Sequence, residues 1–155
     1  MRRRLNLVGI GAISNVVDIT NYILKELGQP MHAFDYTTLE GDAINVRRAT
    51  EGEKIVTLDE DELTLTTENM LICDGVKPVA LAGVMGGLNS EIKDTTTTVL
   101  FESAKFARDN IRRTSRAVGK SSDSSARYAK GVDEYATVMA LKRACYLIEE
   151  LNCGK

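Results

Sequence analysis

The chain has 155 residues, of which 43% are hydrophobic and 27% charged, and its formal net charge is -2. These values are typical of one soluble globular domain with its own core, so we expect a single domain over residues 1–155. The small negative charge argues against a protein that coats nucleic acid. Three cysteines, Cys73, Cys145 and Cys153, form no CxxC or Cys/His cluster and predict neither a metal site nor a disulfide framework. Without a long apolar run or a signal-peptide pattern, we expect a cytoplasmic protein with no membrane partner.

Helical periodicity appears first near the beginning of the chain. Apolar residues recur at helical spacing over residues 15–27, where Asn15 is the expected N-cap and Gly28 lies just past the end. Pro30 then breaks the helical pattern, because proline lacks the backbone N–H that a helix or a sheet ladder uses. We therefore expect residues 31–35 to form a fixed loop or a short turn.

The middle of the chain, from residue 43 to residue 104, has short apolar runs separated by turn residues, a pattern typical of β-strands. The predicted strands lie at residues 44–46, 55–58, 63–65, 70–73, 79–82 and 99–101. The acidic run at residues 59–62 lies between two of them and is expected to be a solvated hairpin turn without chemistry.

Helical character returns near the C-terminus. A short helix is predicted over residues 110–118, ended by Gly119, and a long helix over residues 133–151. We interpret the apolar stripe of the long helix as core in preference to a partner-binding surface; it comprises Val138, Leu141, Cys145 and Ile148, flanked by Ala144 and Leu151. Together the patterns predict an α+β (mixed α/β) fold, with a mixed sheet of several short strands packed with helices.

The glycines of AGVMGG, Gly83, Gly86 and Gly87, have neither of the spacings that bind nucleotides. Glycine permits positive φ and close approach of the backbone, so this segment could form a tight turn or one wall of a small-ligand pocket. Residue type alone leaves both interpretations open.

Basic residues gather between residues 108 and 130, where seven basic residues accompany two acidic ones. Arg112 and Arg116 are four positions apart and share one face of the predicted helix, which suits contacts with a phosphate backbone. With Arg113 and Lys120 they form the candidate RNA-binding set; the alternative is a solvated basic helix end.

Four blocks of sequence carry a resemblance to a known family. NVVDITNYILKELGQPMHAFD at residues 15–35 resembles the segment that opens the editing region of bacterial phenylalanyl-tRNA synthetase beta chains. LAGVMGG, VLFESAKF and DSSARYAKGVD follow in the family's order at residues 81–87, 99–106 and 123–133. Such beta chains are much longer and their region begins upstream of residue 1. The resemblance therefore implies an excised fragment that lacks part of its N-terminal edge.

The resemblance implies a post-transfer editing domain that hydrolyses tyrosine mischarged on tRNA-Phe, as one part of phenylalanine-tRNA ligation. Glu102 matches the family carboxylate that pairs with the tyrosine hydroxyl, and His32, the only histidine, matches the residue that orients the attacking water or the terminal ribose hydroxyl. Without the resemblance, a strand-end glutamate is usually solvated and a lone histidine usually structural. The substrate-binding positions implied are Asn21, Pro30, Ala82, Gly83, Ser122 and Ser124.

No nucleophilic triad and no metal-ligand cluster is visible, so direct attack by a positioned water is expected. Ser121, Ser122, Ser124 and Ala126 depart from the residues common in the family, which bears on the fine specificity of the pocket. The partners implied are the acceptor end of tRNA-Phe and the alpha subunit of an alpha2beta2 enzyme, with no DNA. No cofactor is implied for this domain, whereas the whole enzyme uses ATP and Mg²⁺.

Two other functions stay open on the sequence. One is a structural, RNA-contacting module that is inactive outside the full synthetase. The other is a free-standing deacylase that acts on other mischarged tRNAs.

Overall fold

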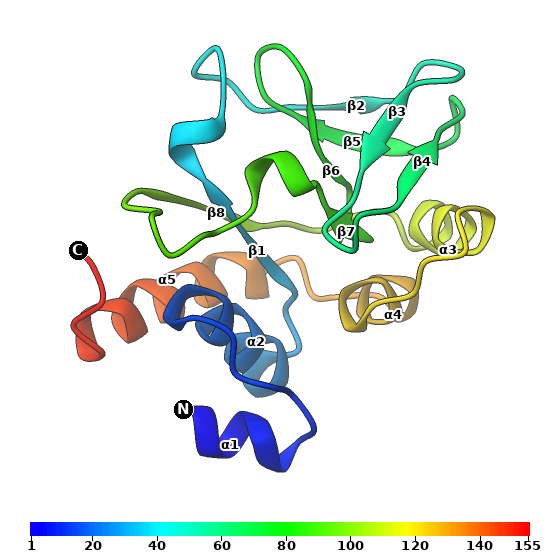
Figure 1. Cartoon of the computed structure of the whole chain (residues 1–155). Coiled ribbons are helices and arrows are strands. Elements are labelled where there is room, and N and C mark those ends of the chain that lie inside the picture. Colours follow the sequence, from blue (N-terminus) through cyan, green and yellow to red (C-terminus); the bar gives the residue numbers. More distant parts are fainter.

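The computed structural model describes all 155 residues and contains helices and short strands in separate layers (Figure 1). Its α-helices are α1 (Arg2–Leu7), α2 (Asn15–Leu27), α3 (Arg108–Ala117), α4 (Asp123–Lys130) and α5 (Ala136–Glu150). Its strands are β1 (Met31–Asp35), β2 (Asn45–Arg48), β3 (Lys54–Val56), β4 (Glu62–Thr64), β5 (Met70–Cys73), β6 (Pro78–Leu81), β7 (Met85–Gly86) and β8 (Val99–Ser103). The predicted α+β class and the long C-terminal helix are confirmed. None of the helices combines the length and the apolar character needed to cross a membrane.

The strands are divided among three antiparallel sheets instead of one mixed sheet. A four-stranded sheet has the order β2-β5-β6-β7, β3 pairs with β4, and β1 pairs with β8. In Figure 1 the β1–β8 pair runs between the other strands above and the helices α2 and α5 below, while α3 and α4 lie together at one side. The two-stranded β1–β8 ladder is therefore the junction of the fold.

Helix α2 occupies the predicted residues, but its N-cap is Ser14 and not Asn15. The Ser14 hydroxyl accepts a hydrogen bond from the backbone N–H of Val17 at 3.3 Å, which satisfies a donor that has no partner inside the helix. Gly28 ends the helix in the left-handed conformation, at φ 73°, as its position predicted.

Residues 31–35 form strand β1, so the expectation of a loop or turn is wrong. Pro30 precedes the first strand residue, and its missing N–H therefore costs the sheet no ladder bond. The partner strand β8 is distant in sequence, and the pairing that makes residues 31–35 extended is invisible in the local pattern.

The interpretation of the α5 stripe as core is confirmed only for Ala144 and Ile148, which pack in a hydrophobic cluster. Val138, Leu141 and Cys145 are exposed, whereas the buried seam of α5 consists of Ala136, Ala140, Ala144 and Leu147. Of this seam, Ala140, Ala144 and Leu147 pack with Ile19, Ile23 and Met31 in one hydrophobic cluster. Alanine lets two helix backbones approach closely, so the bulkier residues one position away are left facing outward.

A larger hydrophobic cluster of 15 buried residues joins the four-stranded sheet to α3 and α4. Leu71 and Val79 of the sheet, Ile111 of α3 and Tyr128 of α4 belong to it, and all four are at most 2% exposed. Helices α1 and α4 were not predicted. This core fixes α4, which contributes one wall of the cavity described next.

Candidate active site at the β1–β8 ladder

The two residues that the resemblance marks as catalytic lie opposite each other. His32 on β1 pairs with Glu102 on β8 in the antiparallel register. Opposite residues in such a pair project from the same face of the sheet, with Cβ atoms about 4.5–5.5 Å apart. Both side chains line one cavity.

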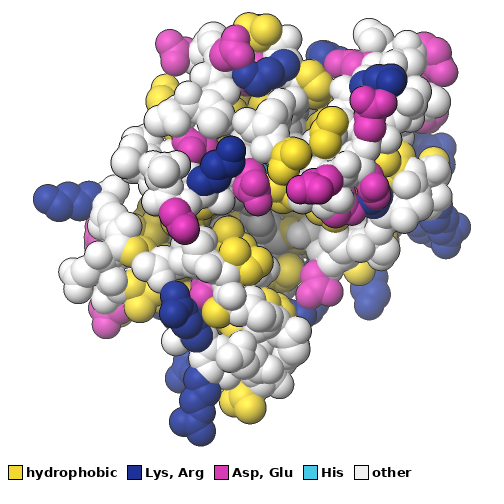
Figure 2. Space-filling model, in the orientation of Figure 1, with side chains coloured by type: hydrophobic (Ala, Val, Ile, Leu, Met, Phe, Trp, Pro, Cys, Tyr) yellow, Lys and Arg dark blue, Asp and Glu magenta, His cyan; other side chains and the backbone are white.

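The cavity has walls from four parts of the chain. Pro30 and His32 come from the start of β1, Glu102 from β8, Gly83 from the turn between β6 and β7, and Ser124 from α4. A wider outer cavity shares His32 and Ser124 with it and extends to Asn21 of α2 and to Ser122. Figure 2, in the orientation of Figure 1, shows a hollow in the middle of the molecule's surface, with hydrophobic side chains around it and acidic side chains near its rim.

One predicted substrate-binding residue lies elsewhere. Ala82 is 1% exposed, belongs to the large hydrophobic cluster and lines neither cavity. Conversely, Tyr128 and Gly86 line the inner cavity but were not singled out for it. Tyr128 follows Ser124 by four positions in DSSARYAKGVD, so recognition of α4 as a helix would have placed both on one face.

The glycine segment serves both as a turn and as a wall. Gly83 has a φ of +67°, in the region that favours glycine, and it lines the inner cavity. A Cβ atom on Gly86 would lie 2.5 Å from Cε1 and 2.7 Å from Nε2 of His32. The missing side chain at position 86 therefore makes room for the imidazole, and the sequence had left this role open.

Burial acts on both candidate catalytic groups. Removal from water raises the pKa of the Glu102 carboxyl to about 7 and lowers the pKa of the His32 imidazole to about 4. His32 Nε2 is buried and has no hydrogen-bond partner. At neutral pH the cavity therefore holds an uncharged imidazole beside a carboxyl that is present in both protonation states.

Ser122 connects the cavity wall to helix α4. As N-cap, its hydroxyl accepts from the backbone N–H of Ser125 at 3.1 Å and donates to the carbonyl of Val84 at 2.8 Å. Ser125 completes a capping box by accepting from the N–H of Ser122. The hydroxyl at position 122 thus fixes α4 against the glycine segment.

The candidate RNA-binding residues are not equivalent. Arg112, Arg113 and Arg116 are exposed on α3, and Arg112 forms an ion pair with Asp109 at 3.3 Å. Lys120 instead forms ion pairs with Asp59 and Asp61, so the acidic turn is exposed, as expected, but also holds a cation. A groove between α3 and α4 is lined by Arg112, Arg116, Ser115, Lys120, Ser121 and Ser125.

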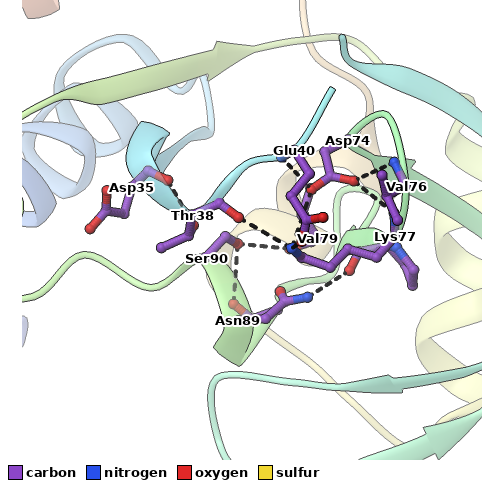
Figure 3. Close-up of polar contacts among 11 residues, drawn as sticks. Asp35, Thr38, Glu40, Asp74, Val76, Lys77, Val79, Asn89 and Ser90 are labelled. Carbon is purple, nitrogen blue, oxygen red and sulfur yellow. Dashed lines mark hydrogen bonds and ion pairs between the residues drawn. The ribbon is translucent and has the colours of Figure 1, made fainter. Parts of the chain in front are cut away.

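A second polar cluster lies away from the cavity, around the turn between β5 and β6 (Figure 3). Burial acts to raise the pKa of Asp74, but hydrogen bonds from the backbone N–H groups of Lys77, Val76 and Glu40 lower it below its ordinary value. The Lys77 ammonium donates to Glu40 and to the carbonyl of Thr38. These contacts hold the segment before β2 to the sheet. No group of three or more His, Cys, Asp or Glu side chains has an arrangement that could hold a metal ion.

The fold and the cavity define a class: an α+β domain that buries an imidazole and a carboxyl side by side on a two-stranded ladder. The model of the B3/4 domain family matches residues 1–153, and the chain belongs to that family.

Curated relatives agree with this assignment. The chain is 56% identical over 155 residues to the "Phenylalanine--tRNA ligase beta subunit" of Syntrophus aciditrophicus, covering 100% of this chain and 19% of the relative. The proteins of the same name from Oleidesulfovibrio alaskensis and Geobacter sulfurreducens are 53% and 52% identical, covering 99% and 98% of this chain. The chain spans 19% of the length of each of these relatives.

Proposed function

We propose that this chain is an editing domain that hydrolyses tyrosine esterified to tRNA-Phe. The observation that carries the proposal is the pairing of His32 with Glu102 in one cavity, where burial is the only cause of both pKa shifts. Neither group is neutralised by a charged neighbour, so both are available to a ligand. The membership of the B3/4 family and the names of the relatives support the setting in a phenylalanine-tRNA ligase.

The proposal explains why a carboxyl lies in a cavity where only half of the lining residues, six of twelve, are hydrophobic. Tyrosine and phenylalanine differ by one hydroxyl, and an apolar pocket rejects an added hydroxyl by only about a hundredfold. A second site must offer that hydroxyl a polar partner. Phenylalanine would leave Glu102 buried and unpaired, at a cost of roughly 1–3 kcal/mol, which favours tyrosine by about 5- to 150-fold.

The chemistry follows from the state of His32. An imidazole with a pKa of about 4 is a weak base near neutral pH, but it can orient a hydroxyl or a water through its unpaired Nε2. Water then attacks the ester carbonyl carbon, and the bond from that carbon to the ribose oxygen breaks. The ribose oxygen takes up the proton that the attacking water loses and leaves as a hydroxyl, and no covalent bond to the enzyme forms.

The proposal also assigns a role in RNA binding to the arginines of α3. Arg112, Arg113 and Arg116 would receive the acceptor end of the tRNA beside the cavity. The alpha subunit, an alpha2beta2 assembly, and ligation with ATP and Mg²⁺ would involve other parts of a larger cytoplasmic enzyme. The editing step itself needs no cofactor in this domain.

The test is deacylation of tyrosyl-tRNA and phenylalanyl-tRNA, both prepared on tRNA-Phe, by the purified chain. We expect selective release of tyrosine, with selectivity lost in Glu102→Ala and retained in Glu62→Ala, a matched glutamate at the exposed start of β4. His32→Ala should abolish release. Ser122→Ala should reduce release less than His32→Ala does, because Ser122 acts through the position of α4.

If the chain alone is inactive, the same variants are compared in the assembled ligase of a relative. Editing there that depends on Glu102 and His32 supports the site assignment and identifies the isolated chain as an RNA-contacting module. Release that is indifferent to both residues in both settings would contradict the proposal.

A further inference from the structure

Two buried side chains outside the proposed catalytic pair converge on the same two backbone carbonyls. Gln29 is fully buried between α2 and β1, and its Nε2 donates to the carbonyl of Ala104 at 2.8 Å and to that of Pro30 at 3.0 Å. Tyr128 of α4 is 2% exposed, and its hydroxyl lies 3.1 Å from the carbonyl of Ala104 and 3.5 Å from that of Pro30. The carbonyl of Ala104 is thus shared by both donors, whereas the single proton of the Tyr128 hydroxyl reaches the carbonyl of Pro30 only at the outer limit of a hydrogen bond.

These carbonyls stand at the end of the ladder that carries the site. Pro30 immediately precedes β1 and Ala104 immediately follows β8. The last registered pair is Met31 with Ser103, and the next pair is His32 with Glu102. The side-chain donors therefore extend the cross-strand connection one step past the ladder, where a two-stranded sheet would otherwise fray.

Gln29 is an unusual choice for this position. Its Oε1 is buried and has no hydrogen-bond partner. The amide cannot be turned over to relieve this, because Oε1 would then face two carbonyl oxygens. An apolar side chain of similar shape would leave no unpaired oxygen, but it would also lose the two donated bonds, which are the contribution of the amide to this position.

Tyr128 connects the same point to the cavity. Its ring lines the inner cavity and packs edge-on against Phe106, with ring centroids 5.0 Å apart. The charge of Glu102 acts together with burial to raise the pKa of the Tyr128 hydroxyl, which keeps it a neutral donor. One residue therefore contacts the ladder end and faces the space beside Glu102.

We propose that Gln29 and Tyr128 are positioning residues that hold the ends of β1 and β8 together and so fix His32 relative to Glu102. This inference rests on the proposed function only for its effect on catalysis. Its structural part concerns the environment of His32 and can be measured without a substrate.

The first experiment uses His32 as a probe, because the chain has one histidine and its ring resonances are unambiguous. Tyr128→Phe removes only the hydroxyl and keeps the ring, and Gln29→Met keeps the unbranched shape. Tyr22→Phe is the control, because it removes a hydroxyl that bonds to Arg4. We expect the NMR titration midpoint of His32 to rise by about half a pH unit or more in the first two variants, as water reaches the ring, and to stay unchanged in the control.

The second experiment is kinetic. A small displacement of reacting groups costs up to about a hundredfold in rate, so kcat for tyrosyl-tRNA should fall by about tenfold or more, with KM changed less than twofold. Folded variants with an unchanged His32 midpoint and unchanged kcat would overturn the inference, even if their thermal stability were lower. If the midpoint shifts but no form of the chain or of the assembled ligase hydrolyses tyrosyl-tRNA, the positioning role stands and the proposed function fails. Should Gln29→Met not fold, Tyr128→Phe decides alone.

Discussion

The cavity at the β1–β8 ladder and the basic surface of α3 use charge in opposite ways. In the cavity, His32 and Glu102 are half-buried, and desolvation shifts the pKa of each toward its neutral form. On α3, Arg112, Arg113 and Arg116 remain exposed, where salt screens their interactions over about 8 Å at physiological ionic strength. Under the proposed function, the cavity would select a ligand group, whereas the exposed arginines would add affinity without selection.

We expect the greatest loss of activity from filling the space that admits His32. In Gly86→Ala, the new Cβ would lie 2.5 Å from the imidazole Cε1, so the ring must move. Deacylation of tyrosyl-tRNA should fall by about a hundredfold, the cost of displacing a catalytic group by roughly 1 Å. Chemical denaturation should show a loss of about 1–3 kcal/mol from overpacking.

Gly11→Ala is the matched control for that substitution. Gly11 has no atoms within 4 Å of its would-be Cβ and no positive φ. Wild-type activity in Gly11→Ala and in Gly86→Ala alike would show that the position of the His32 ring has no bearing on catalysis.

The second prediction concerns pH and the two buried groups. Glu102 has a pKa of about 7 against an ordinary 4.5, so the folded chain binds more protons than the unfolded chain in that interval and loses stability as pH rises. His32 has a pKa of about 4 against an ordinary 6.5, so the unfolded chain binds more protons and the folded chain gains stability as pH rises. Where the intervals overlap, the two contributions oppose each other.

Glu102→Gln removes the contribution of the Glu102 carboxyl to the pH dependence of stability. Relative to wild type, the variant should become more stable as pH rises from about 4.5 to 7, by at most about 3 kcal/mol. Urea unfolding at pH 5 and pH 8 measures this difference, with Glu62→Gln as the exposed control. A Glu102→Gln difference that does not change with pH would show that the carboxyl is not desolvated.

The sequence predicted local features well and non-local ones poorly. The residues of α2 follow from its periodicity and from Gly28, because a helix and its cap are decided within a few positions. Apart from Ala144, the alanine seam of α5 was missed, because which face is buried depends on the partner helix α2. Strand β1 was missed for the same reason, since its partner β8 lies far along the chain.

The candidate site shows the same division. His32 and Glu102 were selected only through the resemblance, and no local pattern indicates that they lie opposite each other. Gln29 was not selected at all, because its role depends on the carbonyl of Ala104, 75 positions away. Ala82 was selected and lies in the core, because neighbouring residues of a turn can face opposite sides of it.

The third prediction, with the smallest effect, concerns the exposed arginines of α3. Arg112→Gln combined with Arg116→Gln should weaken binding of tRNA-Phe without changing binding of free tyrosine. Each lost phosphate contact removes about 0.7–0.9 from the slope of log affinity against log salt, so the double variant should flatten that slope by about 1.5. Fluorescence titrations at several salt concentrations measure it, with Arg3→Gln on α1 as the control.

Lys120→Gln provides the internal contrast for this measurement. Hydrogen bonds to Asp59 and Asp61 raise the pKa of Lys120, and the two carboxylates balance the charge of its ammonium. An RNA phosphate must therefore displace these carboxylates before it can bind Lys120. The slope should therefore change less than for either single arginine variant. An equal or larger change would mean that the acidic turn releases Lys120 when RNA binds, and that the surface beside the cavity rearranges on binding.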